Sequence, residues 1–262
     1  MAPLVIPLYY QLLQAYHPIQ YYSPPPSVLV ENIPLPTPTL AKSNQSYKLA
    51  LIGDSMIDTL SSDICQKSLT SYFPQTNFNL LKYGYGSTTI ESALKRLTEM
   101  TVYLGKNYAS VLSQNPDLIV IESFAYNNYG NSESGINRYR QALTNIIKVI
   151  NDQSPKTKIV LAATIAPNSI SFGNGLKDIH FSALEKIEKT NTIKLYLQNL
   201  INFGSENNLP VANAYQSSLF NQEGLESLIS SGDHLHPSPL GTQLFCDTLA
   251  KTIFDNHLLI AN

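Results

Sequence analysis

Lys48-Leu-Ala-Leu-Ile-Gly-Asp-Ser55 is the stretch that decides the fold, because an unbroken apolar run ends there in a glycine turn and a helical pattern follows. Comparable apolar runs recur downstream at Phe78–Leu81, Asp117–Ile121, Lys158–Ala162 and Leu209–Ala212. Near-continuous apolar strands indicate burial on both faces of a sheet, and their alternation with helices implies right-handed βαβ crossovers. We therefore predict an α/β fold, a three-layer α/β/α sandwich around a five-stranded parallel sheet.

Helical spacing of apolar residues fills the intervals between these runs. The expected helices are Thr59–Leu69, Ile90–Leu112, Ile136–Asn151, Ala183–Asn202 and Pro239–Asp255. Upstream, nine of the 16 prolines lie within the first 38 residues together with five tyrosines, a composition that favours extended polyproline II and excludes regular helix. We therefore divide the chain into a Pro/Tyr-rich N-terminal arm or linker, residues 1–46, and one globular domain, residues 47–262.

Charge and hydropathy narrow the classes of partner. The formal net charge of -2 and the absence of a Lys/Arg cluster argue against nucleic acid. No stretch approaches the ~20 apolar residues that a membrane-spanning helix needs. Residues 4–13 are apolar but lack a basic flank and a cleavage site, so no intact signal peptide is predicted. The arm is typical of a stalk, which predicts a secreted or cell-surface protein; the sequence leaves the oligomeric state open.

The two cysteines, Cys65 and Cys246, allow at most one disulfide and no zinc-type spacing. Free cysteine packs as a small hydrophobe. We interpret both as core thiols, with a Cys65–Cys246 disulfide as the alternative.

Chemistry-bearing residues follow the strands, where ligands bind in parallel sheets. Ser55 stands at a strand-to-helix turn, where unpaired N–H groups and the helix dipole stabilise an oxyanion. Near the other end of the chain, Asp233 and His236 lie three residues apart before the last helix. That spacing lets the carboxylate accept the imidazole Nδ1–H, so that Nε2 can deprotonate a serine. Taken alone, each signal also fits an ordinary capping turn.

Two further turns offer oxyanion donors. Tyr85-Gly86-Ser87 follows the second apolar run, and Tyr126-Asn127-Asn128 follows the third. A backbone N–H at a glycine and a side-chain amide are the kind of donors that form an oxyanion hole. The sequence leaves Gly86 versus Ser87 and Asn127 versus Asn128 open, and we favour Gly86 and Asn127. Tyr85 and Tyr126 are expected to offer aromatic surface to the substrate.

The order Gly-Asp-Ser, Gly-rich turn, Asn turn and Asp-x-x-His-Pro resembles the four sequence blocks of the SGNH (GDSL-type) hydrolases over residues 48–257. The resemblance implies a flavodoxin-like fold and a Ser-His-Asp triad that needs no cofactor and no metal. It makes Ser55 the nucleophile and first oxyanion donor, followed by Gly86 and Asn127, with His236 as base and Asp233 as its partner. The first block ends in Met56 where the family has leucine, and the third has Ala125-Tyr-Asn-Asn where the family has Gly-x-Asn-Asp.

Rival readings have weaker support. The nucleophile elbow Gly-x-Ser-x-Gly of α/β-hydrolases is absent from the sequence. His234 with His236 and Asp233 could bind zinc, but the other three histidines lie in contexts without a matching ligand cluster. Gly84-x-Gly86 lacks the third glycine of a dinucleotide fingerprint. A non-catalytic binding module is disfavoured because both Ser55 and His236 are present.

We therefore expect a serine carboxylesterase that acts through an acyl-enzyme intermediate. The tyrosines predict acceptance of bulky, aromatic or polymeric (polyester) esters as small-molecule or polymer substrates. The alternatives are an O-acyltransferase and a carbohydrate O-deacetylase. The Gly/Asn/Ser-rich loop Pro167–Lys177 is expected to form a wall or lid of the cleft.

Overall fold

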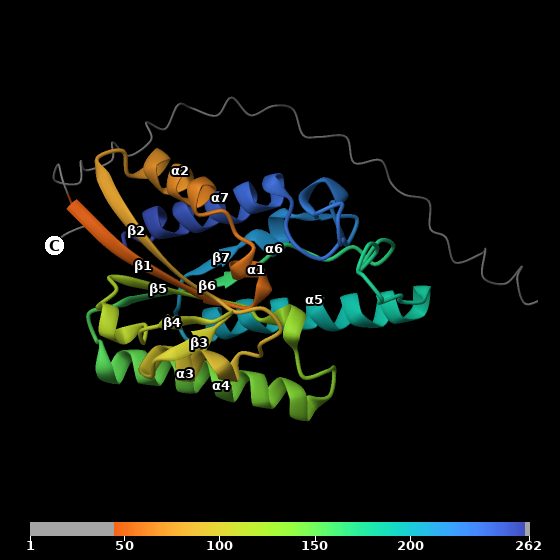
Figure 1. Ribbon diagram of the computed structural model, residues 1–262, viewed down its shortest axis with the longest axis horizontal. Helices are drawn as coiled ribbons and strands as arrows, with labels where there is room; N and C mark the ends of the chain where they lie inside the picture. Colours follow the sequence, from red (N-terminus) through yellow and green to blue (C-terminus); the bar gives the residue numbers. More distant parts are fainter. Residues whose placement is uncertain (1–44, 260–262) are drawn as a thin grey trace, which may run out of the picture. The chain divides into compact units, whose positions relative to one another are not determined.

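A computed structural model describes residues 45–259 of the chain. Its centre is a five-stranded parallel sheet in the order β2-β1-β5-β6-β7, drawn in Figure 1. The strands are β1 (Gln45–Gly53), β2 (Thr76–Gly84), β5 (Leu118–Glu122), β6 (Lys158–Ala163) and β7 (Val211–Asn213). Each expected strand is present, so the predicted sheet is confirmed.

Helices cover both faces of this sheet (Figure 1). α3, α4 and α5 pack on one face, and α2 and α7 pack on the other. The bounds of the helices are α1 (Ser55–Asp58), α2 (Ser62–Tyr72), α3 (Glu91–Thr98), α4 (Glu133–Gln153), α5 (Ala183–Glu206), α6 (Ala214–Ser217) and α7 (Pro239–Asp255). The three-layer α/β/α sandwich is therefore confirmed.

Strand β1 shows why the fold follows from its sequence. Ala50 and Ile52 enter the core beneath α3, α4 and α5, whereas Leu49 and Leu51 enter the core beneath α2 and α7. These four side chains are at most 1% exposed. Because successive strand residues point to opposite faces, a continuous apolar run is what a strand buried on both faces requires.

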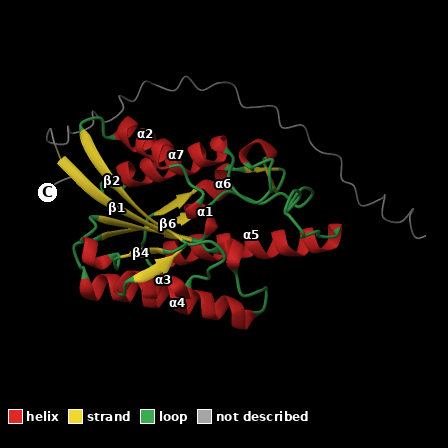
Figure 2. Ribbon diagram, in the orientation of Figure 1, coloured by secondary structure: helices red, strands yellow, loops and turns green. Residues whose placement is uncertain are grey.

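The predicted helix Ile90–Leu112 is wrong beyond its first two turns. α3 ends at Thr98, and the chain then forms an antiparallel hairpin of β3 (Thr101–Tyr103) and β4 (Lys106–Tyr108), shown in Figure 2. Leu104 and Gly105 form the turn with φ of 47° and 75°. Two consecutive positive φ values match the twist of a two-residue hairpin, and the β-branched Thr101 and Val102 favour strand over helix.

The other connections are mostly irregular. Residues 164–182 link β6 to α5 without a helix or strand, and a small hairpin of β8 (Leu219–Phe220) and β9 (Glu223–Gly224) packs against this loop through the hydrogen bond from Gly224 N to Pro167 O. Strand β1 begins two residues before the expected domain boundary, and the predicted arm otherwise lies outside the described residues. Among residues 45–259, no helix has the length and apolarity needed to cross a membrane.

A disulfide joins Cys65 on α2 to Cys246 on α7, so the interpretation of two free thiols is wrong. Both residues are 1% exposed, as core cysteines would be, and the helices that carry them pack side by side on one face of the sheet (Figure 1). The bond closes a loop with a sequence separation of 181, which restricts the unfolded chain strongly.

We expect the double substitution Cys65→Ala and Cys246→Ala to lower the free energy of unfolding by about 2–5 kcal/mol, because the unfolded chain regains the freedom that the cross-link removes. Urea denaturation followed by circular dichroism measures the change. Dithiothreitol should destabilise the wild type and leave the double variant unaffected. Equal stability of the oxidised wild type and the double variant would contradict this role.

Candidate active site

Ser55 is the first residue of α1, directly after β1 ends at Gly53. Asp54 is the N-cap of α1, and its Oδ1 accepts a hydrogen bond of 2.9 Å from Met56 N. The Ser55 N–H is an N-terminal N–H of the helix, which has no intrahelical acceptor. The serine thus lies at the positive end of a helical turn beyond the carboxyl edge of the sheet, where negative charge is stabilised.

Asp233 and His236 form a hydrogen-bonded pair before α7. The two atoms His236 Nδ1 and Asp233 Oδ2 are 2.6 Å apart. Asp233 Oδ1 also accepts from the backbone N–H groups of Leu235 and His236 at 3.0 and 3.1 Å. Burial raises the pKa of Asp233, but these hydrogen bonds outweigh burial and leave the pKa below its usual value. An ionised carboxylate on Nδ1 orients the imidazole with Nε2 free to take a proton.

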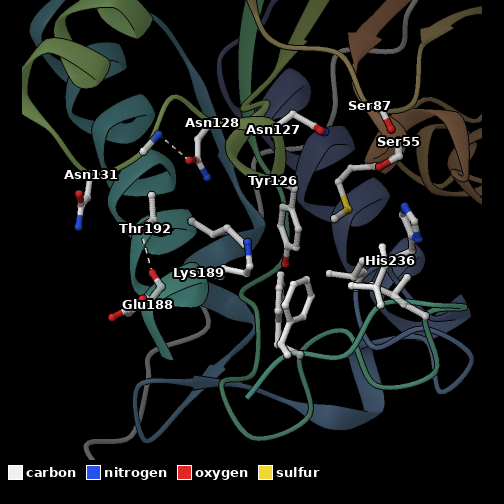
Figure 3. Close-up of a pocket in the computed structure, with 18 residues that line it drawn as sticks. Ser55, Ser87, Tyr126, Asn127, Asn128, Asn131, Glu188, Lys189, Thr192 and His236 are labelled. Atoms are coloured by element: carbon white, nitrogen blue, oxygen red, sulfur yellow. Dashed lines mark hydrogen bonds between the residues drawn. The ribbon is translucent and has the colours of Figure 1, made fainter. Parts of the chain in front are cut away.

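Ser55 and His236 line one cavity of about 980 Å³, and Figure 3 shows them at the same end of it. Within residues 45–259 the Ser55 hydroxyl makes no hydrogen bond. Hydrogen bonds between catalytic groups are often long in the absence of substrate and shorten when substrate is bound. The rest of the lining is Met56, Ser87, Tyr126, Asn127, Asn128, Gly130, Asn131, Phe172, Leu176, Ile179, Phe181, Glu188, Lys189, Thr192, Ile193 and Leu235.

Asn127 and Asn128, in the turn after β5, have different hydrogen-bond partners. Asn127 Nδ2 donates to Asp54 Oδ2 at 2.8 Å, and within residues 45–259 its second amide hydrogen has no acceptor. Asn128 instead supports its own turn, since its Nδ2 donates to Ala125 O at 2.8 Å and its Oδ1 accepts from Gly130 N at 2.9 Å. Both line the cavity, but of the two only Asn127 is hydrogen-bonded to Asp54, the N-cap of the helix that Ser55 begins.

Gly86 does not face the cavity as expected. Its N–H donates to the hydroxyl of Tyr103 at 2.9 Å, so it is already occupied. The next residue, Ser87, has a positive φ of 57° and lines the cavity together with Ser55. Within the described residues the Ser87 N–H has no acceptor, whereas the Gly86 N–H has one.

The two tyrosines expected to meet the substrate also differ. Tyr126 lines the cavity, and its ring stacks on Phe172 at 6.4 Å between centroids. Tyr85 is 6% exposed and lies outside the cavity lining, stacked on Tyr103 at 4.4 Å and facing the Arg96 guanidinium. The expectation of a substrate contact for Tyr85 is therefore corrected, because its ring packs in the core instead.

Arg96 and Glu122 are buried charged residues that sequence reasoning missed. Arg96 is 1% exposed and donates to the carbonyls of Gly53 and Tyr83 at 2.7 and 2.5 Å, which ties the ends of β1 and β2 together. Burial lowers the pKa of Arg96 to about 10. Periodicity gave no signal for this residue, because an arginine in a helical pattern is normally solvated.

Glu122 ends β5 next to Asp54, and both carboxyl groups are 0% exposed. Glu122 Oε2 accepts from Phe124 N at 2.9 Å, and Oε1 lies 2.5 Å from Ser123 Oγ. Burial, with the charge of Asp54 second, raises the pKa of Glu122 to about 8. The pKa of Asp54 is also raised, mainly by burial, although the hydrogen bonds from Met56 and Asn127 oppose this.

The loop Pro167–Lys177 forms a wall of the cavity through Phe172 and Leu176. It is bound to the segment that carries Asp233 and His236, since His234 Nδ1 lies 2.8 Å from Asn174 O and Gly173 N donates to His234 O at 3.3 Å. His234 therefore anchors the cavity wall.

We expect Glu122→Gln to weaken the pH dependence of stability. Between its ordinary pKa of 4.5 and the folded value of about 8, Glu122 holds a proton in the folded state only. Unfolding then releases a proton, so the free energy of unfolding of the wild type should fall as the pH rises through this interval. Urea titrations across the interval should show a smaller fall in the glutamine variant. The exposed Glu188→Gln serves as control and should follow the wild type; a matching slope in Glu122→Gln would refute the idea.

No family model matches the sequence, and no curated protein resembles it significantly. Solved structures do resemble this one. A lipase/acylhydrolase from Enterococcus faecalis aligns with a TM-score of 0.57 at 19% identity, covering 80% of this chain and 96% of that one. An acetylxylan esterase from Geobacillus stearothermophilus gives 0.54 at 15% identity over 81% and 96%. A GDSL-like lipase from Bacteroides thetaiotaomicron gives 0.54 at 13% over 80% and 89%. The chain therefore has the fold of the SGNH hydrolases.

Proposed function

We propose that this protein is a serine ester hydrolase of the SGNH family, with Ser55 as nucleophile, His236 as base and Asp233 as its partner. The observation that carries the proposal is the shared cavity: the serine at the start of α1 and the imidazole paired with Asp233 line one end of it. The fold shared with the GDSL-like lipase and the acetylxylan esterase supports the same reaction class.

The geometry supports acyl transfer in two steps, acylation of Ser55 and hydrolysis of the acyl-enzyme. Ser55 Oγ attacks the ester carbonyl carbon while His236 Nε2 takes the hydroxyl proton, and the imidazolium then protonates the leaving alcohol. Water attacks the acyl-enzyme with the same imidazole as base and releases the acid. During both steps the oxyanion accepts hydrogen bonds from the backbone N–H groups of Ser55 and Ser87 and from the free amide hydrogen of Asn127.

The middle of the cavity favours esters with a bulky apolar or aromatic group. Tyr126, Phe172 and Phe181 form a row of rings, with 6.4 Å between the first two centroids and 5.9 Å between the last two. Leu176 and Ile193 add aliphatic surface to the same cavity. Each buried CH₂ of a substrate contributes about 0.8 kcal/mol, so longer acyl groups and polyester segments gain binding energy here.

The far end of the cavity favours a second candidate, a carbohydrate O-deacetylase or sugar O-acyltransferase. Asn128, Asn131, Glu188, Lys189 and Thr192 line this end, which Figure 3 shows opposite Ser55 and His236. Amide, hydroxyl and charged groups together offer both donors and acceptors to sugar hydroxyls. A sugar hydroxyl bound there would compete with water for the acyl-enzyme.

We also propose that the protein acts outside the reducing cytosol. The disulfide between Cys65 and Cys246 supports this location, because such bonds form and persist in oxidising compartments. The Pro-rich composition of the first 38 residues fits a surface tether.

Ser55→Ala should abolish hydrolysis of p-nitrophenyl butyrate, because no other group in the mechanism attacks the carbonyl. The release of p-nitrophenolate measures the rate, and circular dichroism with a thermal melt checks that the fold is kept. Ser61→Ala is the matched control, since Ser61 precedes α2 and is absent from the cavity lining. Activity of Ser55→Ala near that of the wild type would overturn the assignment of the nucleophile.

The wild type should hydrolyse p-nitrophenyl octanoate with a higher kcat/KM than the acetate, because the longer chain buries apolar surface. Leu176→Trp should take up space in the cavity and reduce this ratio while leaving the acetate rate unchanged, because Leu176 lines the cavity. Leu184→Trp is the control, because Leu184 is 65% exposed and absent from the lining. A ratio that is equal in all three proteins would show that the acyl group binds elsewhere.

A further inference from the structure

The hydroxyl of Tyr103 bridges two segments of the candidate site. It donates to Asp58 Oδ2 at 2.7 Å and accepts from Gly86 N at 2.9 Å. Asp58 is the last residue of α1, the four-residue helix that Ser55 begins. Gly86 immediately precedes Ser87, whose N–H has no acceptor among the described residues. One hydroxyl thus links the nucleophile helix to the turn that carries an oxyanion donor.

The approach between these segments is close. A Cβ added at Gly86 would lie 3.2 Å from the Tyr103 hydroxyl oxygen and 3.8 Å from Ser55 Cβ. The turn therefore passes directly beside the nucleophile, and a small movement of the turn would change the separation of the Ser55 and Ser87 N–H groups. Hydrogen-bond donors stabilise an oxyanion only when both lie within about 2.7–3.1 Å of it.

The ring that carries this hydroxyl is itself held in place. Tyr103 stacks on Tyr85 with 4.4 Å between centroids and an angle of 8° between planes. Tyr85 is fixed by the hydrogen bond of 2.7 Å between its hydroxyl and Thr101 Oγ1 and by the guanidinium of Arg96, 4.5 Å from its centroid. Because these contacts involve the ring and not the hydroxyl of Tyr103, the hydroxyl can be removed while the stack remains.

We propose that Tyr103, through its hydrogen bonds to Asp58 and Gly86, is a positioning residue that sets the distance between the nucleophile and the Ser87 oxyanion donor. The inference rests on the proposed esterase function. Tyr103 does not line the cavity, so it acts through Ser55 and Ser87 and does not touch the substrate. The hydrogen bond to Asp58 raises the pKa of Tyr103, which keeps the bridging proton in place.

The test is Tyr103→Phe, which removes the bridging oxygen and keeps the ring. We expect kcat for p-nitrophenyl butyrate to fall by about tenfold to a hundredfold with KM unchanged, because a misplaced donor weakens the transition state and not substrate binding. Tyr108→Phe is the matched control on the same hairpin. Tyr108 also packs on Tyr85, at 5.4 Å between centroids, and its hydroxyl makes no hydrogen bond within residues 45–259.

A second readout does not depend on turnover. Hydrogen exchange of the Gly86 amide, followed by NMR, should be faster in Tyr103→Phe than in the wild type and unchanged in Tyr108→Phe. In the Asp58→Ala background, Tyr103→Phe should lower kcat little further, because both residues belong to one bridge.

The outcomes separate the two proposals. If the wild type hydrolyses esters through Ser55 but Tyr103→Phe and Tyr108→Phe have equal kcat, the positioning role is overturned and the esterase function stands. A fall in kcat that is matched by a rise in KM, or unchanged exchange at Gly86, also overturns it. A wild type with no Ser55-dependent hydrolysis overturns both proposals.

Discussion

The candidate site depends on two hydrogen bonds that the carboxylate of Asp54 accepts. One oxygen caps α1 through Met56 N, and the other accepts the amide of Asn127. The turn after β1 that carries Ser55 and the turn after β5 that carries Asn127 are thereby joined through a single side chain that is 0% exposed. A buried carboxylate without these donors would carry a large desolvation cost, so the same two hydrogen bonds that stabilise Asp54 also orient the site.

Burying Asp54 and Glu122 side by side carries a desolvation cost, and the buried charge of Arg96 offsets part of that cost. Burial raises the pKa of Asp54, and the charge of the Arg96 guanidinium opposes part of this rise. The hydrogen bonds of Arg96 go instead to the carbonyls at the ends of β1 and β2. Arginine can do this because its planar fork presents several donors at fixed angles. The positive charge of Arg96 therefore stabilises negative charge on the two carboxyl groups. Its N–H donors join the carboxyl ends of β1 and β2, next to which Ser55 lies.

Much of this arrangement was predictable because it is local in the sequence. The apolar run of β1 sets the position of Ser55, and the three-residue spacing of Asp233 and His236 sets their hydrogen bond. The orientation of the Gly86 N–H was not predictable, since it depends on Tyr103, 17 residues away on a hairpin that the helical spacing concealed. The disulfide was missed for a related reason: the cysteines have a sequence separation of 181, and only the packing of α2 on α7 brings them together.

The loop that forms a wall of the cavity is hydrogen-bonded to the segment that carries His236. Gly175 has a φ of 91° and approaches Gly232 so closely that a side chain would meet its carbonyl, while His234 binds the backbone of Asn174. Lys186 of α5 donates to Ile170 O of the same loop at 3.2 Å. A loop held by these contacts behaves as a wall and not as a mobile lid, because moving it would break contacts to the segment that holds Asp233 and His236. Substitutions in this loop should consequently alter both the shape of the cavity and the placement of the imidazole, so that substrate preference and catalysis are coupled through the backbone around His234.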